Sequence, residues 1–130
     1  MSETTDFKST FTSTERRRAS AAMLLSRPSH IPVICEKAPK SKMEGPSLIK
    51  VLIPPERQVA YLLHLIRRRT KIAPTQALFL LVDGVLPPTS MELGVLFEER
   101  RDADGFMYTG EETFGEGTVE EEEEEEETEG

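Results

Sequence analysis

The apolar residues of this chain fall into short blocks, separated by Pro, Gly and charged residues. Two blocks, Ile31–Cys35 and Leu48–Ile53, are rich in β-branched residues, which is typical of strands. A Lys/Ser/Gly/Pro-rich segment, Pro39–Pro46, lies between them, and Pro54-Pro55 follows the second block. Because proline is favoured in the first turn of a helix, this pattern predicts two strands joined by a loop and followed by a helix.

That helix is also predicted by apolar residues spaced i, i+3, i+4 and i+7, namely Val59, Leu62, Leu63 and Ile66. It ends in Arg67–Arg69, where positive charges stabilise a helix C-terminus. An earlier helix is expected to start at Ser13 or Thr14, whose hydroxyls suit a cap, and to end before Pro28. Residues Met1–Phe11 are mostly polar, and we expect no regular structure there.

In the second half, Leu78–Val82 is almost wholly apolar, which predicts a central strand buried on both faces. A helix is expected over Met91–Arg101, capped by Thr89 or Ser90. A short final strand is expected at Phe106–Tyr108.

The predicted order is helix, strand, strand, helix, strand, helix, strand. Two strands, a crossing helix and two more strands resemble the β-grasp arrangement of ubiquitin, whereas a doubly wound parallel sheet needs regular strand–helix alternation. We therefore predict an α+β chain: a flexible segment and helix at 1–27, a ubiquitin-like β-grasp domain at 28–115, and a disordered tail at 116–130.

The tail is strongly acidic. Residues 116–130 hold ten glutamates and no Lys or Arg. Residues 1–115 therefore carry 14 of the 24 acidic residues and all 16 basic ones, which gives this part of the chain a net charge of +2. Such a segment cannot join a packed core. It is either a removable extension that leaves a functional Gly115 carboxylate or an acidic solubility tail; Phe114-Gly115 ahead of it fits the first interpretation.

Other chemistry has little support in the sequence. Cys35 is the single cysteine, so no disulfide is expected within the chain, and we expect a buried, inert thiol in a reducing cytosol. The two histidines, His30 and His64, offer no metal-ligand spacing, and we expect neither a metal nor a cofactor. The basic residues lack interleaved aromatic ones, which argues against nucleic acid, and the longest apolar run is far too short to span a bilayer.

Six blocks of sequence, in this order, resemble the autophagy ubiquitin-like modifiers of the autophagy-related protein 8 family, which includes the GABARAP-like and microtubule-associated light-chain-like proteins. The blocks are His30–Lys37, Lys50–Glu56, Leu65–Arg69, Ala77–Thr89, Asp102–Phe106 and Glu111–Gly115. The resemblance implies a modifier rather than an enzyme. A cysteine protease would cut after Gly115, and activating and conjugating enzymes would join Gly115, next to Phe114, to phosphatidylethanolamine. The protein would move from the cytoplasm to the autophagosome membrane and recruit cargo receptors.

The resemblance also implies a groove for aromatic-x-x-aliphatic peptides, which add a strand beside the second strand of the sheet. Its aromatic pocket would be formed by Pro32, Ile34, Lys50, Leu52 and Phe106. Its aliphatic pocket would be formed by Val51, Ile53, Pro54, Leu62 and Leu65. Arg69 matches a position that the processing protease recognises.

Three departures from the family pattern matter. Arg57 replaces an apolar residue beside the aliphatic pocket, and a one-residue shift leaves either Met23 or Leu24 to close the aromatic pocket. The segment from Gly105 to Gly115 is about three residues shorter than usual. This last departure motivates an alternative function, a non-conjugated adaptor that binds peptide motifs without lipidation.

Overall fold

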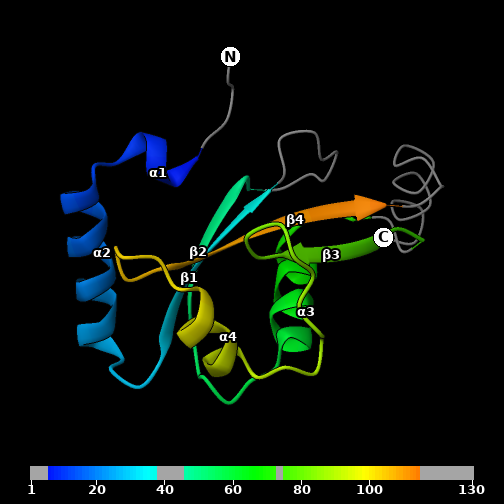
Figure 1. Ribbon diagram of the computed structural model, residues 1–130. Helices are drawn as coiled ribbons and strands as arrows, with labels where there is room; N and C mark the ends of the chain where they lie inside the picture. The colour runs from blue at the N-terminus through cyan, green and yellow to red at the C-terminus, as the bar shows by residue number, and fades with distance from the viewer. Residues whose placement is uncertain (1–5, 38–45, 73–74, 115–130) are drawn as a thin grey trace.

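The computed structural model describes residues 6–37, 46–72 and 75–114, in which helices lie on both faces of a four-stranded sheet (Figure 1). The helices and strands are α1 Phe7–Thr10, α2 Ser13–Ser26, β1 Ile31–Lys37, β2 Leu48–Ile53, α3 Val59–Arg69, β3 Ala77–Leu81, α4 Leu93–Arg100 and β4 Met107–Phe114. In this part of the chain, no helix has the length and apolar character needed to cross a membrane.

The sheet has the order β2-β1-β4-β3. Strand β1 pairs antiparallel with β2 and parallel with β4, and β3 pairs antiparallel with β4. The first and last strands therefore lie side by side at the centre, and α3 makes the crossing between the two halves. The predicted β-grasp arrangement is confirmed.

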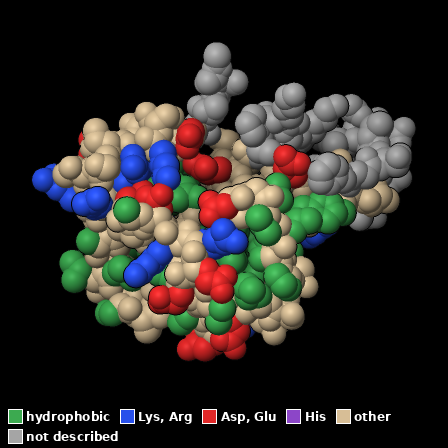
Figure 2. Space-filling model, in the orientation of Figure 1, with side chains coloured by type: hydrophobic (Ala, Val, Ile, Leu, Met, Phe, Trp, Pro, Cys, Tyr) green, Lys and Arg blue, Asp and Glu red, His purple; other side chains and the backbone are tan. Residues whose placement is uncertain are grey.

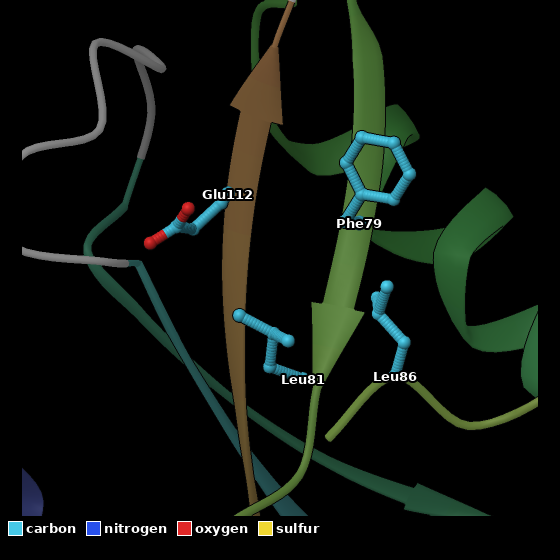
Figure 3. A pocket seen from close by; sticks show the side chains of 4 residues that line it. All are labelled: Phe79, Leu81, Leu86 and Glu112. Atoms are coloured by element: carbon cyan, nitrogen blue, oxygen red, sulfur yellow. The ribbon is translucent and has the colours of Figure 1, made fainter. Parts of the chain in front are cut away.

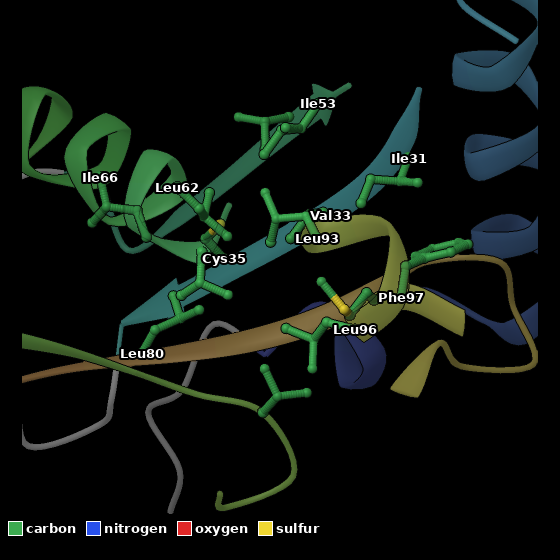
Figure 4. Close-up of a cluster of buried hydrophobic side chains, with 14 of the residues drawn as sticks. Ile31, Val33, Cys35, Ile53, Leu62, Ile66, Leu80, Leu93, Leu96 and Phe97 are labelled. Carbon is green, nitrogen blue, oxygen red and sulfur yellow. The ribbon is translucent and has the colours of Figure 1, made fainter. Parts of the chain in front are cut away.

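The main core lies between one face of the sheet and helices α3 and α4 (Figure 4). Strand β1 contributes Ile31, Val33 and Cys35 to this face, because alternate side chains of a strand point the same way. Helix α3 contributes Val59, Leu62 and Ile66, and α4 contributes Leu93, Leu96 and Phe97. The predicted apolar stripe of α3 is thus buried, with Leu63 at its half-buried edge.

A second, smaller cluster lies on the opposite face, under α1 and α2. It contains Phe7, Ile34 and Phe106, with Ala19, Met23, Leu48 and Tyr108 packed around them. The prediction of no regular structure over Met1–Phe11 was therefore wrong for its second half, since Phe7–Thr10 forms α1 and the Phe7 side chain is buried. Residues 1–5 lie outside the described part of the chain.

Helix α2 begins one residue after its cap. The side chain of Thr12 accepts a hydrogen bond from the Glu15 N–H, and the Glu15 carboxylate accepts one from the Thr12 N–H. This reciprocal pair is a capping box. Ser13 and Thr14, the predicted caps, instead lie within the helix.

Helix α4 begins later than predicted and lacks a hydroxyl cap. Its cap residue is Glu92, which makes no side-chain capping bond. The N–H groups of Leu93 and Gly94 instead donate to the backbone carbonyls of Arg57 and Pro55, at 2.7 and 2.9 Å. The loop before α3 takes the place of Thr89 or Ser90, and a Cβ at Gly94 would meet the Pro55 Cβ at 2.8 Å.

Two strand predictions also need correction. Strand β3 is an edge strand whose burial alternates, with Leu78 and Leu80 in the core, so it is not buried on both faces. Strand β4 has eight residues rather than three, because it pairs with both β1 and β3. The segment from Glu111 to Phe114, which lies beyond the predicted strand, belongs to β4 and pairs with Ala77–Leu80.

Candidate functional site

The residues predicted to form the peptide groove come from β1, β2, α3 and the loops after β2 and before β4. In the described chain, β2 pairs only with β1, so its other edge is open to an added strand. Lys50 is exposed and Leu52 half-buried, whereas Ile49, Val51 and Ile53 point to the core. Because successive side chains of a strand point to opposite faces, a strand added along this edge would have one set of side chains on the α1–α2 face and the other on the α3 face.

The predicted aromatic pocket is brought together on the α1–α2 face. Pro32, Ile34 and Phe106 have almost no exposed surface. The Phe7 ring covers part of this group: its centroid lies 5.5 Å from that of Phe106, edge to face. Lys50 Nζ lies 5.9 Å from the same Phe7 ring.

Sequence reasoning missed Phe7, although the signal was an apolar residue standing alone in a polar segment directly after Asp6, which caps α1. It left open whether Met23 or Leu24 closes the pocket. The structure packs Met23 against the Phe7–Ile34–Phe106 cluster.

The predicted aliphatic pocket is more deeply buried than a binding surface requires. Val51, Ile53 and Leu62 belong to the core, and only Pro54 and Leu65 are half-buried. Leu65 joins Tyr61, Arg68 and Arg69 in lining a hollow on the outer side of α3. The guanidinium of Arg57 lies over the Tyr61 ring, 4.6 Å from its centroid, in a cation–π contact that keeps it near this side of α3.

A polar network holds α2 against the loop before β4. One carboxylate oxygen of the buried Asp104 accepts from Arg16 Nε at 2.9 Å and from the Tyr108 hydroxyl at 2.5 Å. The other oxygen accepts from the Phe106 N–H at 2.9 Å. Burial, followed by the hydrogen bond to Asp104, raises the pKa of Tyr108, so its hydroxyl stays protonated and donates.

Ser20 completes this contact by donating its hydroxyl to the Asp104 carbonyl at 2.7 Å. A Cβ on Gly105 would collide with the Ser20 hydroxyl, and Gly105 has a φ of 98° that favours glycine. The close approach of α2 to this turn therefore depends on Gly105. Figure 2 shows a group of Lys and Arg side chains on the α2 side of the molecule, next to acidic ones.

Two titratable side chains, Glu111 of β4 and Cys35 of β1, are buried in the sheet. Glu111 accepts a hydrogen bond from the Thr109 hydroxyl at 3.0 Å, and burial raises its pKa to about 8. Cys35 is buried, as predicted, and burial raises the pKa of its thiol. No cluster of His, Cys, Asp and Glu side chains suited to a metal ion exists among the described residues.

An apolar hollow lies where the far face of β3 is left uncovered by the helices (Figure 3). Phe79 and Leu81 of β3, Leu86 after the following turn, and Glu112 of β4 line it. The tight turn comes from Asp83 and Gly84, whose φ values are both positive. This hollow was not predicted, because β3 was expected to be covered on both faces.

Of the two residues of the predicted cleavage site, the structure describes Phe114. Phe114 is the last residue of β4 and pairs with Ala77 of β3. Gly115 and the acidic stretch lie outside the described residues. The guanidinium of Arg67 donates to the backbone carbonyl of Gln76 at 2.8 Å. The end of α3 therefore lies near the start of β3.

Comparison with known families matches residues 15–115 to "Autophagy protein Atg8 ubiquitin like". The chain belongs to this family of ubiquitin-like autophagy proteins. Autophagy-related protein 8 of Schizosaccharomyces pombe is 38% identical over 112 residues, which cover 84% of this chain and 93% of the relative. Its namesake in Gibberella zeae is 42% identical over 106 residues, 78% of this chain and 90% of the relative.

The fold agrees with this membership. The crystal structure of Trypanosoma brucei ATG8 matches with a TM-score of 0.78 and 24% sequence identity, covering 88% of this chain and 98% of that one. The ubiquitin-like fold with N-terminal helices is thereby established. The expected membership of the ubiquitin-like autophagy proteins is confirmed.

Proposed function

We propose that this protein is an autophagy modifier that is cut after Gly115 and joined through the new carboxylate to phosphatidylethanolamine. The observation that carries the proposal is the coincidence of three boundaries. The family match ends at residue 115, the last strand ends at Phe114, and the glutamate-rich stretch starts at residue 116. A glycine at this position leaves no side chain to obstruct attack at its carbonyl carbon.

Processing needs a cysteine protease, and conjugation needs the activating and conjugating enzymes of the autophagy system. Arg69, exposed at the end of α3, is our candidate for protease recognition. Because Phe114 is paired with Ala77, a protease that reads an extended segment has to engage Gly115 directly or separate the last residues of β4 from β3. Two acyl chains then suffice for stable anchoring, since each buried methylene contributes about 0.8 kcal/mol.

We further propose that the groove along β2 recruits cargo receptors that carry aromatic-x-x-aliphatic motifs. The open edge of β2 supplies backbone partners for the peptide. The aromatic anchor would bind near Lys50, Leu52 and Phe106, and the aliphatic anchor near Pro54 and Leu65. The conjugated protein would then hold cargo at the autophagosome membrane, and the free protein would remain in the cytoplasm.

The test is mass spectrometry of the protein recovered from cells in which autophagy is induced. We expect a form that ends at the free Gly115 carboxylate and a lipid-linked form. Phospholipase D should release phosphatidic acid from the lipid-linked form and leave an ethanolamine amide of Gly115. Gly115→Ala should abolish the lipid-linked form. Glu112→Gln, a nearby substitution that leaves Gly115 intact, is the control and should keep both forms.

A chain that remains intact to Gly130 and never carries lipid would contradict the modifier proposal. If that chain still binds aromatic-x-x-aliphatic peptides, the non-conjugated adaptor becomes the better account. The extension of β4 to Phe114, which leaves no unpaired spacer before Gly115, is the observation that favours it.

A further inference from the structure

Helix α1 places an aromatic ring of this chain on the surface proposed to bind an aromatic ring of a partner. The Phe7 side chain is only 4% exposed and is clustered with Ile34 and Phe106, two residues of the predicted aromatic pocket. Its ring also lies 6.3 Å from that of Tyr108. The rings of Phe7 and Phe106 meet at 82°, the edge-to-face geometry that aromatic pairs prefer.

The cation of the predicted pocket also faces Phe7. Lys50 Nζ lies 5.9 Å from the centroid of the Phe7 ring, while the Lys50 side chain remains exposed. Phe7 therefore already has the environment expected for a bound aromatic anchor: an apolar floor, an aromatic edge and a cation near its face.

The rest of α1 is held mainly by contacts at the surface. Arg16 donates to the carbonyls of Lys8 and Phe11 at 3.2 and 2.7 Å, and Lys8 Nζ lies 4.9 Å from the centroid of the Tyr108 ring. The helix has four residues, far fewer than a helix needs to be stable by itself. Its Phe7 N–H donates to the Glu36 carboxylate at 2.8 Å, and Lys8 Nζ forms a 2.6 Å ion pair with Asp102. That ion pair is partly exposed, at 45% and 27% for the two side chains, and exposed pairs contribute little to stability.

We propose that α1 is a displaceable latch, in which Phe7 occupies the aromatic pocket and competes with the aromatic anchor of a partner peptide. This inference rests on the proposed peptide-binding function and adds its regulation. The apparent Kd equals the intrinsic Kd divided by the fraction of molecules in which the pocket is free. A latch that is closed in about nine-tenths of the molecules therefore lowers the apparent affinity about tenfold.

The test measures binding of a synthetic peptide, acetyl-Asp-Glu-Trp-Ser-Ala-Leu-amide, to the full chain by calorimetry, with a second peptide in which Ala replaces Trp as the reference. We expect Phe7→Ala to bind the Trp peptide about tenfold more tightly than the unmodified chain. Leu25→Ala, which removes an apolar side chain that is 83% exposed on α2, is the matched control and should leave the affinity unchanged.

A second variant weakens the latch without touching the pocket. Lys8→Ala removes the ion pair with Asp102 and should tighten Trp-peptide binding by about two- to threefold, in line with the small energy of an exposed pair. Hydrogen exchange gives an independent readout. In the unmodified chain, the Phe7 amide should lose its protection when the Trp peptide binds, because its bond to Glu36 breaks.

Three results would overturn the latch. The first is a folded Phe7→Ala variant that binds the Trp peptide no more tightly than the unmodified chain does. Phe7 would then be part of the pocket wall and not a competitor for the pocket. Another is a Phe7 amide that stays protected in the complex. The third is equal binding of the Trp and Ala peptides by every variant; it alone would also refute the proposed groove, so the two failures are distinguishable.

Discussion

Arg16 and Asp104 lie 88 positions apart in the sequence, yet Arg16 Nε donates to the Asp104 carboxylate at 2.9 Å. The same carboxylate binds Tyr108 and the Phe106 N–H, so one buried side chain joins α2, the turn before β4 and β4 itself. The N-terminal helices and the sheet therefore form one side of the proposed groove together.

We predict that Asp104→Ala lowers the free energy of unfolding by about 2–4 kcal/mol, because it leaves several hydrogen-bonding groups without their buried partner. Urea denaturation measures the change. Arg100→Ala is the control: Arg100 is 39% exposed and pairs with Asp83 at 3.6 Å, so its loss should cost less than about 1 kcal/mol. Equal losses in both variants would show that the Asp104 network does not stabilise the fold.

Gly105→Ala should be costly for two reasons. Its φ of 98° is unfavourable for residues with a Cβ, and the new Cβ would collide with the Ser20 hydroxyl. We expect a loss of about 2–4 kcal/mol in unfolding free energy.

Gly84→Ala separates these two causes. Gly84 also has a positive φ, 77°, but has open space around its missing Cβ. This variant should show only the backbone cost, about 1–2 kcal/mol. A Gly105→Ala protein as stable as Gly84→Ala would mean that α2 moves away at no cost.

Glu111 makes stability depend on pH. Burial raises its pKa from 4.5 to about 8, so the folded state binds more protons than the unfolded state between these values. Its stabilising contribution is complete below about pH 4.5, decreases as pH rises, and is lost above about pH 8. Glu111→Gln should flatten this part of the stability profile, as measured by thermal unfolding at several pH values.

The matched control for this experiment is Glu112→Gln. Successive strand residues point to opposite faces, so the Glu112 side chain faces away from the core and lines the outer hollow. This variant should keep the pH profile of the unmodified chain. If Glu111→Gln shows the same decrease of stability with pH as the unmodified chain, the pH dependence arises from other groups.

Cys35 should be chemically silent in the folded protein. Its side chain is 1% exposed, and burial raises its pKa, so little thiolate is available for alkylation. We expect no labelling by iodoacetamide under native conditions and complete labelling in denaturant, as counted by mass spectrometry. Rapid native labelling would show that β1 opens readily.

Leu52→Ala and Leu65→Ala test the two sides of the groove. The side chains are half-buried on β2 and α3, and truncating either anchor contact should weaken binding of the Trp peptide by roughly fivefold or more, or about 1 kcal/mol. Exposed His64, next to Leu65 on α3, offers a control in His64→Ala. Unchanged binding by both leucine variants would show that the groove is assigned to the wrong surface.

Much of the fold could be predicted from local pattern. The bounds of β2 and α3 match their expected ranges, because β-branched runs and a helical apolar stripe are encoded by neighbouring residues. The order of the elements then indicated the β-grasp arrangement. The early end predicted for β4 failed because Thr109–Phe114 carry polar residues, and their strand conformation comes from pairing with β1 and β3.

The site was predicted only in outline. Family motifs placed Lys50, Leu52 and Phe106 on one surface, but they did not indicate that Phe7 covers it, because α1 is too short to be stable without the pocket beneath it. Likewise, the backbone carbonyls of Arg57 and Pro55 cap α4, where a hydroxyl was expected. Both arrangements depend on segments that are distant in sequence.

The sequence by itself determined which segments become strands and helices, the acidic character of residues 116–130 and the position of Gly115, since each depends only on neighbouring side chains. The tertiary structure decided that β3 is an edge strand, that β4 reaches Phe114 and that Phe7 lies against Phe106. These features arise when the sheet assembles, because burial and backbone pairing between distant segments then outweigh local preference.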